Sequence, residues 1–268
     1  MDEVNKSHII EKLIYNSKRK SVKYAIAKRI CFFVNFFLKD YLIKITPSYK
    51  NTMMTHEALM NIMYLLREII IKDVEGDIVE LGCYDGLTSI LISKTLKESN
   101  SKKRLFLYDS FEGLARSDFS KEDGNIFLTP GSLKTSYKRL VNNYKRFNSK
   151  LPKVIIGDIR QTFIKKSPKK IAFAHIDLDL YGPTLFALKK IFPRLSKGAI
   201  VVLDDYGNPA IPGVKKAVSD YIMNKIMNKN LYIYTLYGGE YPPMPDLRPK
   251  VLGEEILKKY QAYLIRKA

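Results

Sequence analysis

Two short apolar runs that end in paired carboxylates constrain the fold of this chain more than any other feature. One run, IAFAHIDLDLYGPT, carries Asp177 and Asp179, and the other, GAIVVLDDYG, carries Asp204 and Asp205. Both lack the alternation of a half-buried strand, which is typical of strands covered by helices on both faces. The acids then lie at the carboxyl ends of strands, where open α/β sheets bind ligands. We therefore expect the four carboxylates to meet at a metal site or an acid-base site.

The alternative is that these acids only end the strands and cap the helices that follow, as Asp204 and Asp205 could do before Gly207 and Pro209. A single pair of acids would not decide between the two interpretations. Two pairs favour a site, because like charges repel one another and are held together mainly by a cation or by function.

The size and composition of the chain predict one α/β domain with a helical extension rather than two domains. It has 268 residues, of which 46% are hydrophobic, enough to bury a substantial core. Its two cysteines, Cys31 and Cys83, lie far apart and offer neither a disulfide framework nor zinc-ligand spacing. The three histidines also lack ligand spacing, and we interpret His175, inside an apolar run, as a core residue. A reducing, cytoplasmic location is the simplest interpretation.

The chain is strongly basic, with 46 Lys and Arg against 27 Asp and Glu and a formal net charge of +19. Such a charge fits an anionic partner, which could be nucleic acid, a phosphorylated or nucleotide-linked substrate, or an acidic membrane surface. The favoured interpretation is a lysine-rich solvated surface, because the composition as a whole is rich in Lys, Ile and Asn. Nucleic acid is the least favoured partner, because no arginine-rich stripe or RNA-binding aromatic signature accompanies the charge.

Residues 1–50 are predicted to form a basic helical extension, with 11 Lys and Arg against 4 Asp and Glu. Its apolar stretch, ICFFVNFFL at 30–38, is too short to span a bilayer. We expect the extension to pack on the domain or on a second subunit of a homo-oligomer. The alternative is a basic helix that lies on the inner membrane face.

From residue 55 onward the pattern predicts alternating helices and strands. Helices are expected at 55–72, 86–98 and 132–147, and beginning near Pro183 and Gly213. Strands are expected at 77–82, 104–110, 153–158, 171–177, 199–205, 231–238 and 261–267. The stretch 111–130, rich in Gly, Ser, Asp and Pro, is expected to form a loop or lid.

The turn after the first strand, Glu80-Leu81-Gly82-Cys83-Tyr84-Asp85-Gly86, suits a nucleoside ligand. Gly82 permits a tight turn, and Gly86 permits close approach of the next helix. The run is not GxGxxG, and an acid with G-x-x-x-G fits a ligand that has an amino group and no phosphates, such as S-adenosylmethionine. One strand later, Asp109 is placed to accept hydrogen bonds from ribose hydroxyls.

Several of these motifs together resemble one family. They are DSFEGL at 109–114, the D-x-D-x-Y of Asp177 to Tyr181 with Thr184, the triplet Asp204-Asp205-Tyr206, and the pair Thr52-Met53. This combination is similar to the TylF/MycF/NovP family of metal- and S-adenosylmethionine-dependent sugar O-methyltransferases, named for macrocin O-methyltransferase. The resemblance covers roughly four-fifths of the chain, from Thr52 to its end.

The resemblance implies a Rossmann-like class I methyltransferase domain over 51–268, with a seven-stranded, mostly parallel sheet whose last strand is antiparallel. It implies that Mg²⁺ is held by Asp177, Asp204 and Asp205, and that Asp179 is the general base. The implied cofactor-binding residues are Thr52, Met53, Glu80, Gly82, Tyr84, Gly86, Asp109, Ser110 and Asp158. The chain departs from the family pattern at His175 and Pro183, where Arg and Ser are usual, and at Asp85, where a basic or neutral residue is usual.

The sequence therefore predicts an enzyme that transfers a methyl group from S-adenosylmethionine to a hydroxyl of a sugar, within a glycan, a glycolipid, a nucleotide-linked precursor or a natural product. The positive charge of the chain fits an anionic acceptor but does not require one. One alternative is an RNA-associated, methyltransferase-like binding protein. The other is an NAD-dependent oxidoreductase, which the missing GxGxxG disfavours.

Overall fold

The computed structural model describes residue 54 and residues 56–223, 231–236 and 261–266, all of which belong to one compact unit, Met53–Ala268. The predicted extension at 1–50 and the pair Thr52 and Met53 lie outside the described residues. No helix among the described residues is long and apolar enough to cross a membrane.

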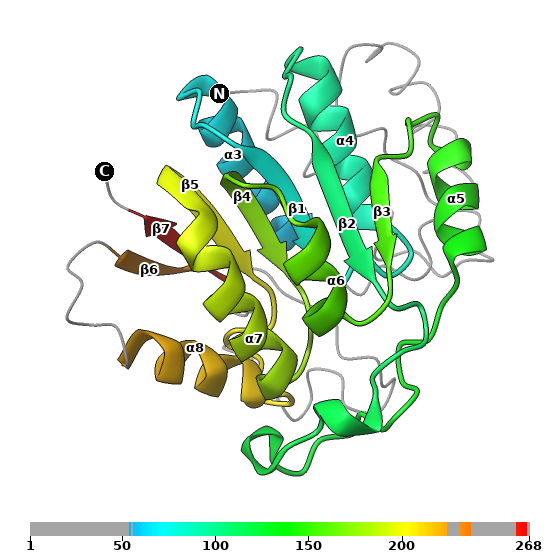
Figure 1. Cartoon of the computed structure of the whole chain (residues 1–268), viewed down its shortest axis with the longest axis vertical. Coiled ribbons are helices and arrows are strands. Elements are labelled where there is room, and N and C mark those ends of the chain that lie inside the picture. Colours follow the sequence, from blue (N-terminus) through cyan, green and yellow to red (C-terminus); the bar gives the residue numbers. More distant parts are fainter. Residues whose placement is uncertain (1–53, 55, 224–230, 237–260, 267–268) are drawn as a thin grey trace, which may run out of the picture. The chain divides into compact units, whose positions relative to one another are not determined.

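One seven-stranded sheet with the order β3-β2-β1-β4-β5-β7-β6 forms the centre of this unit (Figure 1). The strands are β1 (Asp77–Leu81), β2 (Leu105–Asp109), β3 (Lys153–Ile156), β4 (Ile171–Ile176), β5 (Leu195–Leu203), β6 (Leu231–Leu236) and β7 (Gln261–Arg266). β1 to β5 pair in parallel, whereas β7 is antiparallel to both β5 and β6. The predicted fold class, with its antiparallel last strand, is confirmed.

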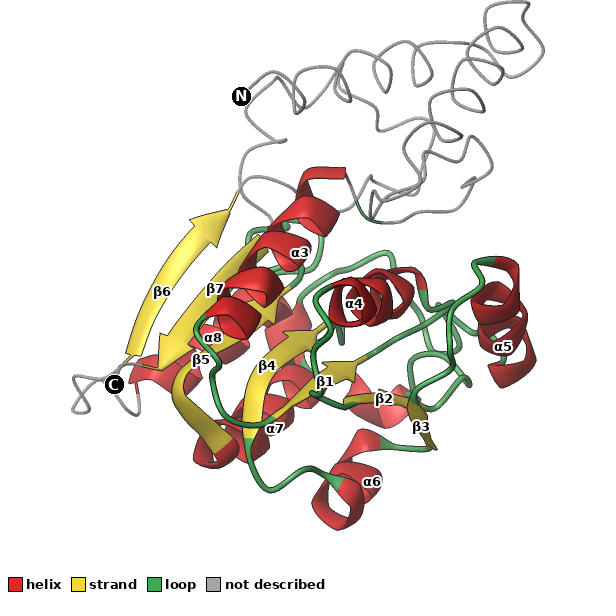
Figure 2. Ribbon diagram, turned by 90° about the horizontal axis from the view of Figure 1, so that it is seen from above, coloured by secondary structure: helices red, strands yellow, loops and turns green. Residues whose placement is uncertain are grey.

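Helices cover both faces of the sheet (Figure 2). They are α3 (His56–Ile71), α4 (Leu87–Glu98), α5 (Tyr137–Arg146), α6 (Ile159–Lys166), α7 (Tyr181–Ile191) and α8 (Gly213–Met223). α3 packs against α4 on one face, and α6 and α8 pack against α7 on the other. Every residue of β4 is buried between these layers, which explains the absence of alternation in its sequence.

One helix prediction needs correction, and one helix was not predicted. The basic helix expected at 132–147 is α5 and begins only at Tyr137. Leu133 has a left-handed φ of 62°, which breaks any helix there, and the Ser136 side chain caps the helix by accepting a hydrogen bond from the Arg139 backbone N–H. The sequence interpretation also missed α6, a helix of 8 residues that Asp158 caps in the same way.

The 111–130 segment is less open than the expected loop or lid. It contains two short 3₁₀-helices, Arg116–Asp118 and Lys121–Asp123. Asp123 is buried, and its carboxylate accepts a hydrogen bond of 2.7 Å from the backbone N–H of Tyr181, at the start of α7. The segment is thereby fastened to the helix that follows β4, and Asp123 supplies the cap that α7 lacks from its own residues.

Candidate active site

A cleft opens at the carboxyl ends of the parallel strands, where the chain order reverses between β1 and β4. Ligands bind at such a reversal point in open α/β sheets. The predicted site residues among its lining are Gly82, Tyr84, Asp109, Ser110, Asp158, Asp177 and Asp179. Glu80, Gly86, Asp204 and Asp205 lie outside that lining, with Glu80, Asp204 and Asp205 buried beneath the cleft.

The two pairs of strand-end acids converge as the sequence predicted. Carboxylate oxygens of Asp177, Asp179 and Asp205 lie within 4.8 Å of one another, and Asp177 and Asp204 form a second such group with His175. The sheet hydrogen bonds continue past the strand ends and fix two of these acids: the Asp177 N–H donates to Leu81, and the Asp204 N–H donates to Ile176. Neither Asp204 nor Asp205 caps α8, which begins several residues later at Gly213.

Backbone strain accompanies the other two acids. Asp179 has a φ of 59° at the centre of a three-residue turn that the Leu180 N–H closes on the Leu178 carbonyl at 2.6 Å. Asp205 has a φ of 56°. Both conformations are sparsely populated outside glycine and tend to persist at functional sites, where the surrounding structure enforces them.

The electrostatics of the cluster follow from burial and like charge. Burial, followed by repulsion from Asp204 and Asp109, raises the pKa of Asp179 to about 7. Burial and repulsion from Asp204 and Asp179 raise the pKa of Asp205 well above its usual range. A divalent cation would remove this repulsion.

The donor set fits a hard cation. Carboxylate oxygens are the ligands that Mg²⁺ prefers. Asp205 Oδ2 is buried and has no hydrogen-bond partner among the described residues, while Oδ1 accepts a hydrogen bond of 2.9 Å from the Asn208 side chain. An oxygen in that state is available to a metal ion, and leaving it without any partner would be costly.

The Gly82 turn brings the cofactor loop against the metal cluster. Gly82 has a φ of 83°, and a Cβ there would lie 1.7 Å from the carbonyl oxygen of Asp177. Gly86, with a φ of 85°, is the N-cap of α4, and a Cβ there would lie 2.3 Å from the Leu140 side chain of α5. The positive φ favours glycine at both positions, and at Gly82 the close approach to a backbone carbonyl excludes a Cβ as well.

Asp109 organises the rim of the cleft through its backbone partners. Its two carboxylate oxygens accept hydrogen bonds of 2.7 Å from the backbone N–H groups of Tyr84 and Phe111. Burial raises its pKa, and the hydrogen bonds from Phe111 and Tyr84 oppose that rise. The side chain thus connects the turn after β1 to the segment after β2, and it lines the cleft with carboxylate oxygen.

Asp85 fastens the same turn to α5. Its carboxylate accepts a hydrogen bond of 2.5 Å from the Thr135 hydroxyl and pairs with Arg139 at 2.7 Å. The acid that departs from the family pattern therefore has a structural partner on the neighbouring helix.

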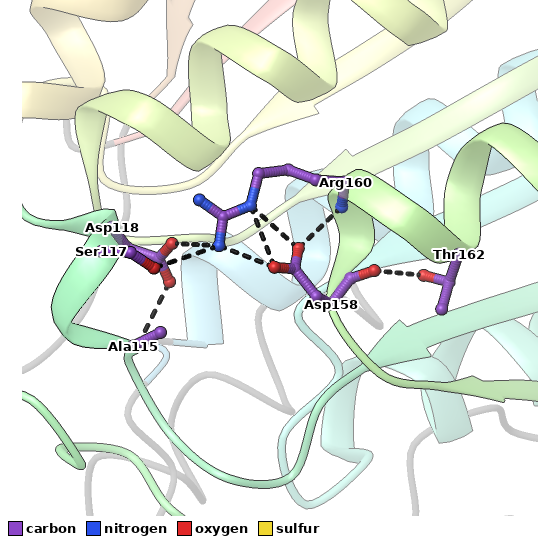
Figure 3. Close-up of polar contacts among 6 residues, drawn as sticks. All are labelled: Ala115, Ser117, Asp118, Asp158, Arg160 and Thr162. Atoms are coloured by element: carbon purple, nitrogen blue, oxygen red, sulfur yellow. Dashed lines mark hydrogen bonds and ion pairs between the residues drawn. The ribbon is translucent and has the colours of Figure 1, made fainter.

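Arg160 links Asp158 to Asp118 in a clasp of ion pairs (Figure 3), and all three residues line the cleft. The Arg160 guanidinium group forms a bidentate pair with Asp158, with Nε donating to Oδ1 at 3.0 Å and Nη2 to Oδ2 at 2.7 Å, and Nη2 also lies 2.7 Å from Oδ1 of Asp118 in the first 3₁₀-helix. Hydrogen bonds from Arg160 lower the pKa of Asp158. The sequence interpretation identified Asp158 but missed Arg160 and Asp118, since a lone arginine in a short helix and a lone acid in a polar loop follow no pattern.

The chain and its fold are similar to known O-methyltransferases. Residues 38–235 match the family model described as macrocin-O-methyltransferase (TylF). The chain is 30% identical over 182 residues to 8-demethyl-8-(2,3-dimethoxy-alpha-L-rhamnosyl)-tetracenomycin-C 4'-O-methyltransferase of Streptomyces olivaceus, covering 65% of this chain and 69% of that protein. The solved O-methyltransferase NovP superposes with a TM-score of 0.69 at 20% identity over 99% of both chains. An O-methyltransferase from Bacillus cereus, solved with S-adenosylhomocysteine (SAH), superposes with a TM-score of 0.50 at 12% identity over 97% of both chains.

Proposed function

The chain belongs to the macrocin O-methyltransferase (TylF) family, and we propose that it methylates a sugar hydroxyl at the four-acid cluster beside the cleft. It is an S-adenosylmethionine-dependent O-methyltransferase by that membership. The sugar acceptor is supported by the Streptomyces olivaceus relative, whose name places the methyl group on a rhamnosyl unit. The observation that carries the proposal is the convergence of Asp177, Asp179 and Asp205, whose carboxylate oxygens lie within 4.8 Å of one another at the edge of the cleft.

The chemistry of the reaction accounts for an acidic cluster. An aliphatic hydroxyl is a poor nucleophile near neutral pH, so methyl transfer to it needs a base, a Lewis acid or both. Asp177, Asp204 and Asp205 would hold Mg²⁺, which when bound would supply Lewis acidity to the hydroxyl oxygen. Asp179 lines the cleft beside these residues and would accept the hydroxyl proton.

Cofactor binding would use the other side of the cleft. The Gly82 turn lines the cleft, and Asp109, although it already accepts two backbone hydrogen bonds, retains lone pairs for ribose hydroxyls. Asp158 and Ser110 line the same side. Placing the sulfonium methyl in line with the acceptor oxygen would lower the barrier by several kcal/mol, roughly the contribution of positioning in enzymes.

We also infer that residues 51–268 form the methyltransferase domain and residues 1–50 a basic extension. A chain shortened to residues 51–268 would then still bind S-adenosylhomocysteine in calorimetry. Loss of that binding in a folded, shortened chain would mean that residues 1–50 are part of the methyltransferase domain.

The test of the function is a methyl-transfer screen. The full chain would be incubated with isotopically labelled S-adenosylmethionine, Mg²⁺ and a panel of nucleotide-linked sugars, glycolipids and glycans that includes rhamnose-bearing acceptors. Mass spectrometry should find one labelled methyl ether on a sugar hydroxyl, and EDTA should abolish the product reversibly. A labelled methyl group on nitrogen, or undiminished turnover in excess EDTA, would contradict the proposal.

A further inference from the structure

His175 occupies an unusual place for a histidine that only fills the core. It is 0% exposed near the carboxyl end of β4, and its Nδ1 lies 3.0 Å from Oε1 of Glu80, its register partner on β1. The second ring nitrogen, Nε2, is buried and has no hydrogen-bond partner among the described residues. A buried imidazole nitrogen in that state needs an explanation.

The pairing with Glu80 favours one tautomer of a neutral His175. An ionised Glu80 carboxylate only accepts hydrogen bonds, so in that tautomer the Nδ1–H donates to it. Nε2 then keeps its lone pair. This is the arrangement in which a carboxylate orients a metal-binding histidine and makes its other nitrogen more basic.

The free nitrogen belongs to a ring that borders the acid cluster. A ring nitrogen of His175 and carboxylate oxygens of Asp177 and Asp204 all lie within 4.8 Å of one another. His175 and Asp177 are two residues apart at the end of β4, so their side chains leave the backbone toward the same face of the sheet.

From this geometry we propose that His175 is a further ligand of the divalent cation, bound through Nε2 and oriented by Glu80. The inference rests on the metal site of the proposed function and extends it by a nitrogen ligand.

A nitrogen ligand changes which cations the site prefers. Carboxylate sites suit Mg²⁺, Ca²⁺ and Mn²⁺, whereas imidazole favours later first-row metals such as Co²⁺ and Ni²⁺. The site should therefore bind Co²⁺ more tightly than Mg²⁺, and part of that preference should depend on His175.

Pulsed electron paramagnetic resonance of Mn²⁺ bound to the full chain tests the proposal without any turnover. The chain has three histidines, His8, His56 and His175. A variant with His8→Gln and His56→Gln keeps His175 as its only histidine and serves as the matched reference. Its Mn²⁺ signal should show coupling to a directly bound ¹⁴N nucleus, and labelling of histidine with ¹⁵N should replace that coupling by the ¹⁵N pattern.

The variant His175→Gln should lose the nitrogen coupling. In calorimetry it should bind Co²⁺ at least about 10-fold more weakly, and Mg²⁺ should be affected less, since only Co²⁺ favours imidazole over oxygen. Bound Mn²⁺ without histidine coupling in the reference variant would overturn the inference and leave the proposed function standing. Failure of Mn²⁺ to bind at all would overturn both. The measurement on the reference variant decides even if His175→Gln does not fold.

Discussion

Substitution of Gly82, which is not a proposed metal ligand, should displace Asp177, which is one. An added Cβ would lie 1.7 Å from the Asp177 carbonyl oxygen, whereas real Cβ atoms essentially never approach within 3.0 Å of another atom. The turn after β1 and the end of β4 would have to separate by about 1.3 Å, the difference between these two distances. The contact joins a Cβ, whose position the backbone fixes, to a backbone carbonyl oxygen, so no side chain can rotate to relieve it.

Two costs add in the Gly82→Ala variant. The left-handed φ of 83° costs about 1–2 kcal/mol for a residue with a Cβ, and overpacking adds about 1–3 kcal/mol. We expect the free energy of unfolding to fall by about 2–5 kcal/mol, measured by urea denaturation followed by circular dichroism. Because Asp177 moves with its carbonyl group, turnover should also fall by about 100-fold, the usual effect of a 1 Å misplacement.

Gly131 provides a matched control. Its φ is 87°, nearly that of Gly82, but a Cβ there would meet nothing within 4 Å. Gly131→Ala should therefore show only the conformational cost, about 1–2 kcal/mol, with metal affinity unchanged. Equal destabilisation in the two variants, or normal Mg²⁺ affinity in Gly82→Ala, would refute the argument that contact with Asp177 constrains this position.

Four further outcomes are expected. Asp179→Asn should keep cofactor binding in calorimetry but lower turnover by about 10²–10⁴-fold, the contribution of a positioned general base, and full activity would remove Asp179 from that role. Asp109→Ala should weaken S-adenosylhomocysteine binding by about 1–3 kcal/mol in the same assay, and tight NADH binding in place of it would contradict the cofactor assignment. If the basic surface serves an anionic acceptor, KM for that acceptor should rise with salt while affinity for S-adenosylmethionine changes little. Equal salt sensitivity of both would mean that the positive charge has no role in acceptor binding. Arg160→Met should raise the pKa of Asp158 in a nuclear magnetic resonance titration, because hydrogen bonds from Arg160 are the main cause of the lowered pKa. In the native protein the pair contributes stability at pH values above the usual Asp pKa, and that contribution is lost on acidification. The variant should show a smaller contribution. An unchanged Asp158 titration would mean that the clasp does not hold in solution.

The sheet could be predicted from the sequence because its strands carry their own signal. β4 and the end of β5 are apolar without alternation, and both are buried on two faces. α6 gave no comparable signal, because only Phe163 among its 8 residues is buried and its last turn is basic. Its N-cap, Asp158, was interpreted only as a cofactor residue, although an acid at that position also predicts the start of a helix.

The acid cluster was predictable for a topological reason. Parallel strands that each end in an acid present those acids at one edge, so the pairs at 177–179 and 204–205 converge whatever the loops do. The Arg160 clasp and the cap that Asp123 gives to α7 depend instead on contacts across 42 and 58 residues, between short 3₁₀-helices and the first turns of α6 and α7. Such contacts leave no periodic pattern in a single sequence.

His175 is buried in the core, as the sequence predicts, and it also borders the acid cluster. The sequence placed it in an apolar strand and favoured a core histidine, and it is fully buried there. The sequence does not reveal the strand register. Only the pairing of β1 with β4 sets Glu80 opposite His175 and thereby gives Nδ1 a hydrogen-bond partner. A core histidine of the ordinary kind would have both nitrogens engaged. Because a partner is found for Nδ1 alone, and because the ring borders two carboxylates of the cluster, the imidazole is better explained as part of the metal site than as filling of the sheet.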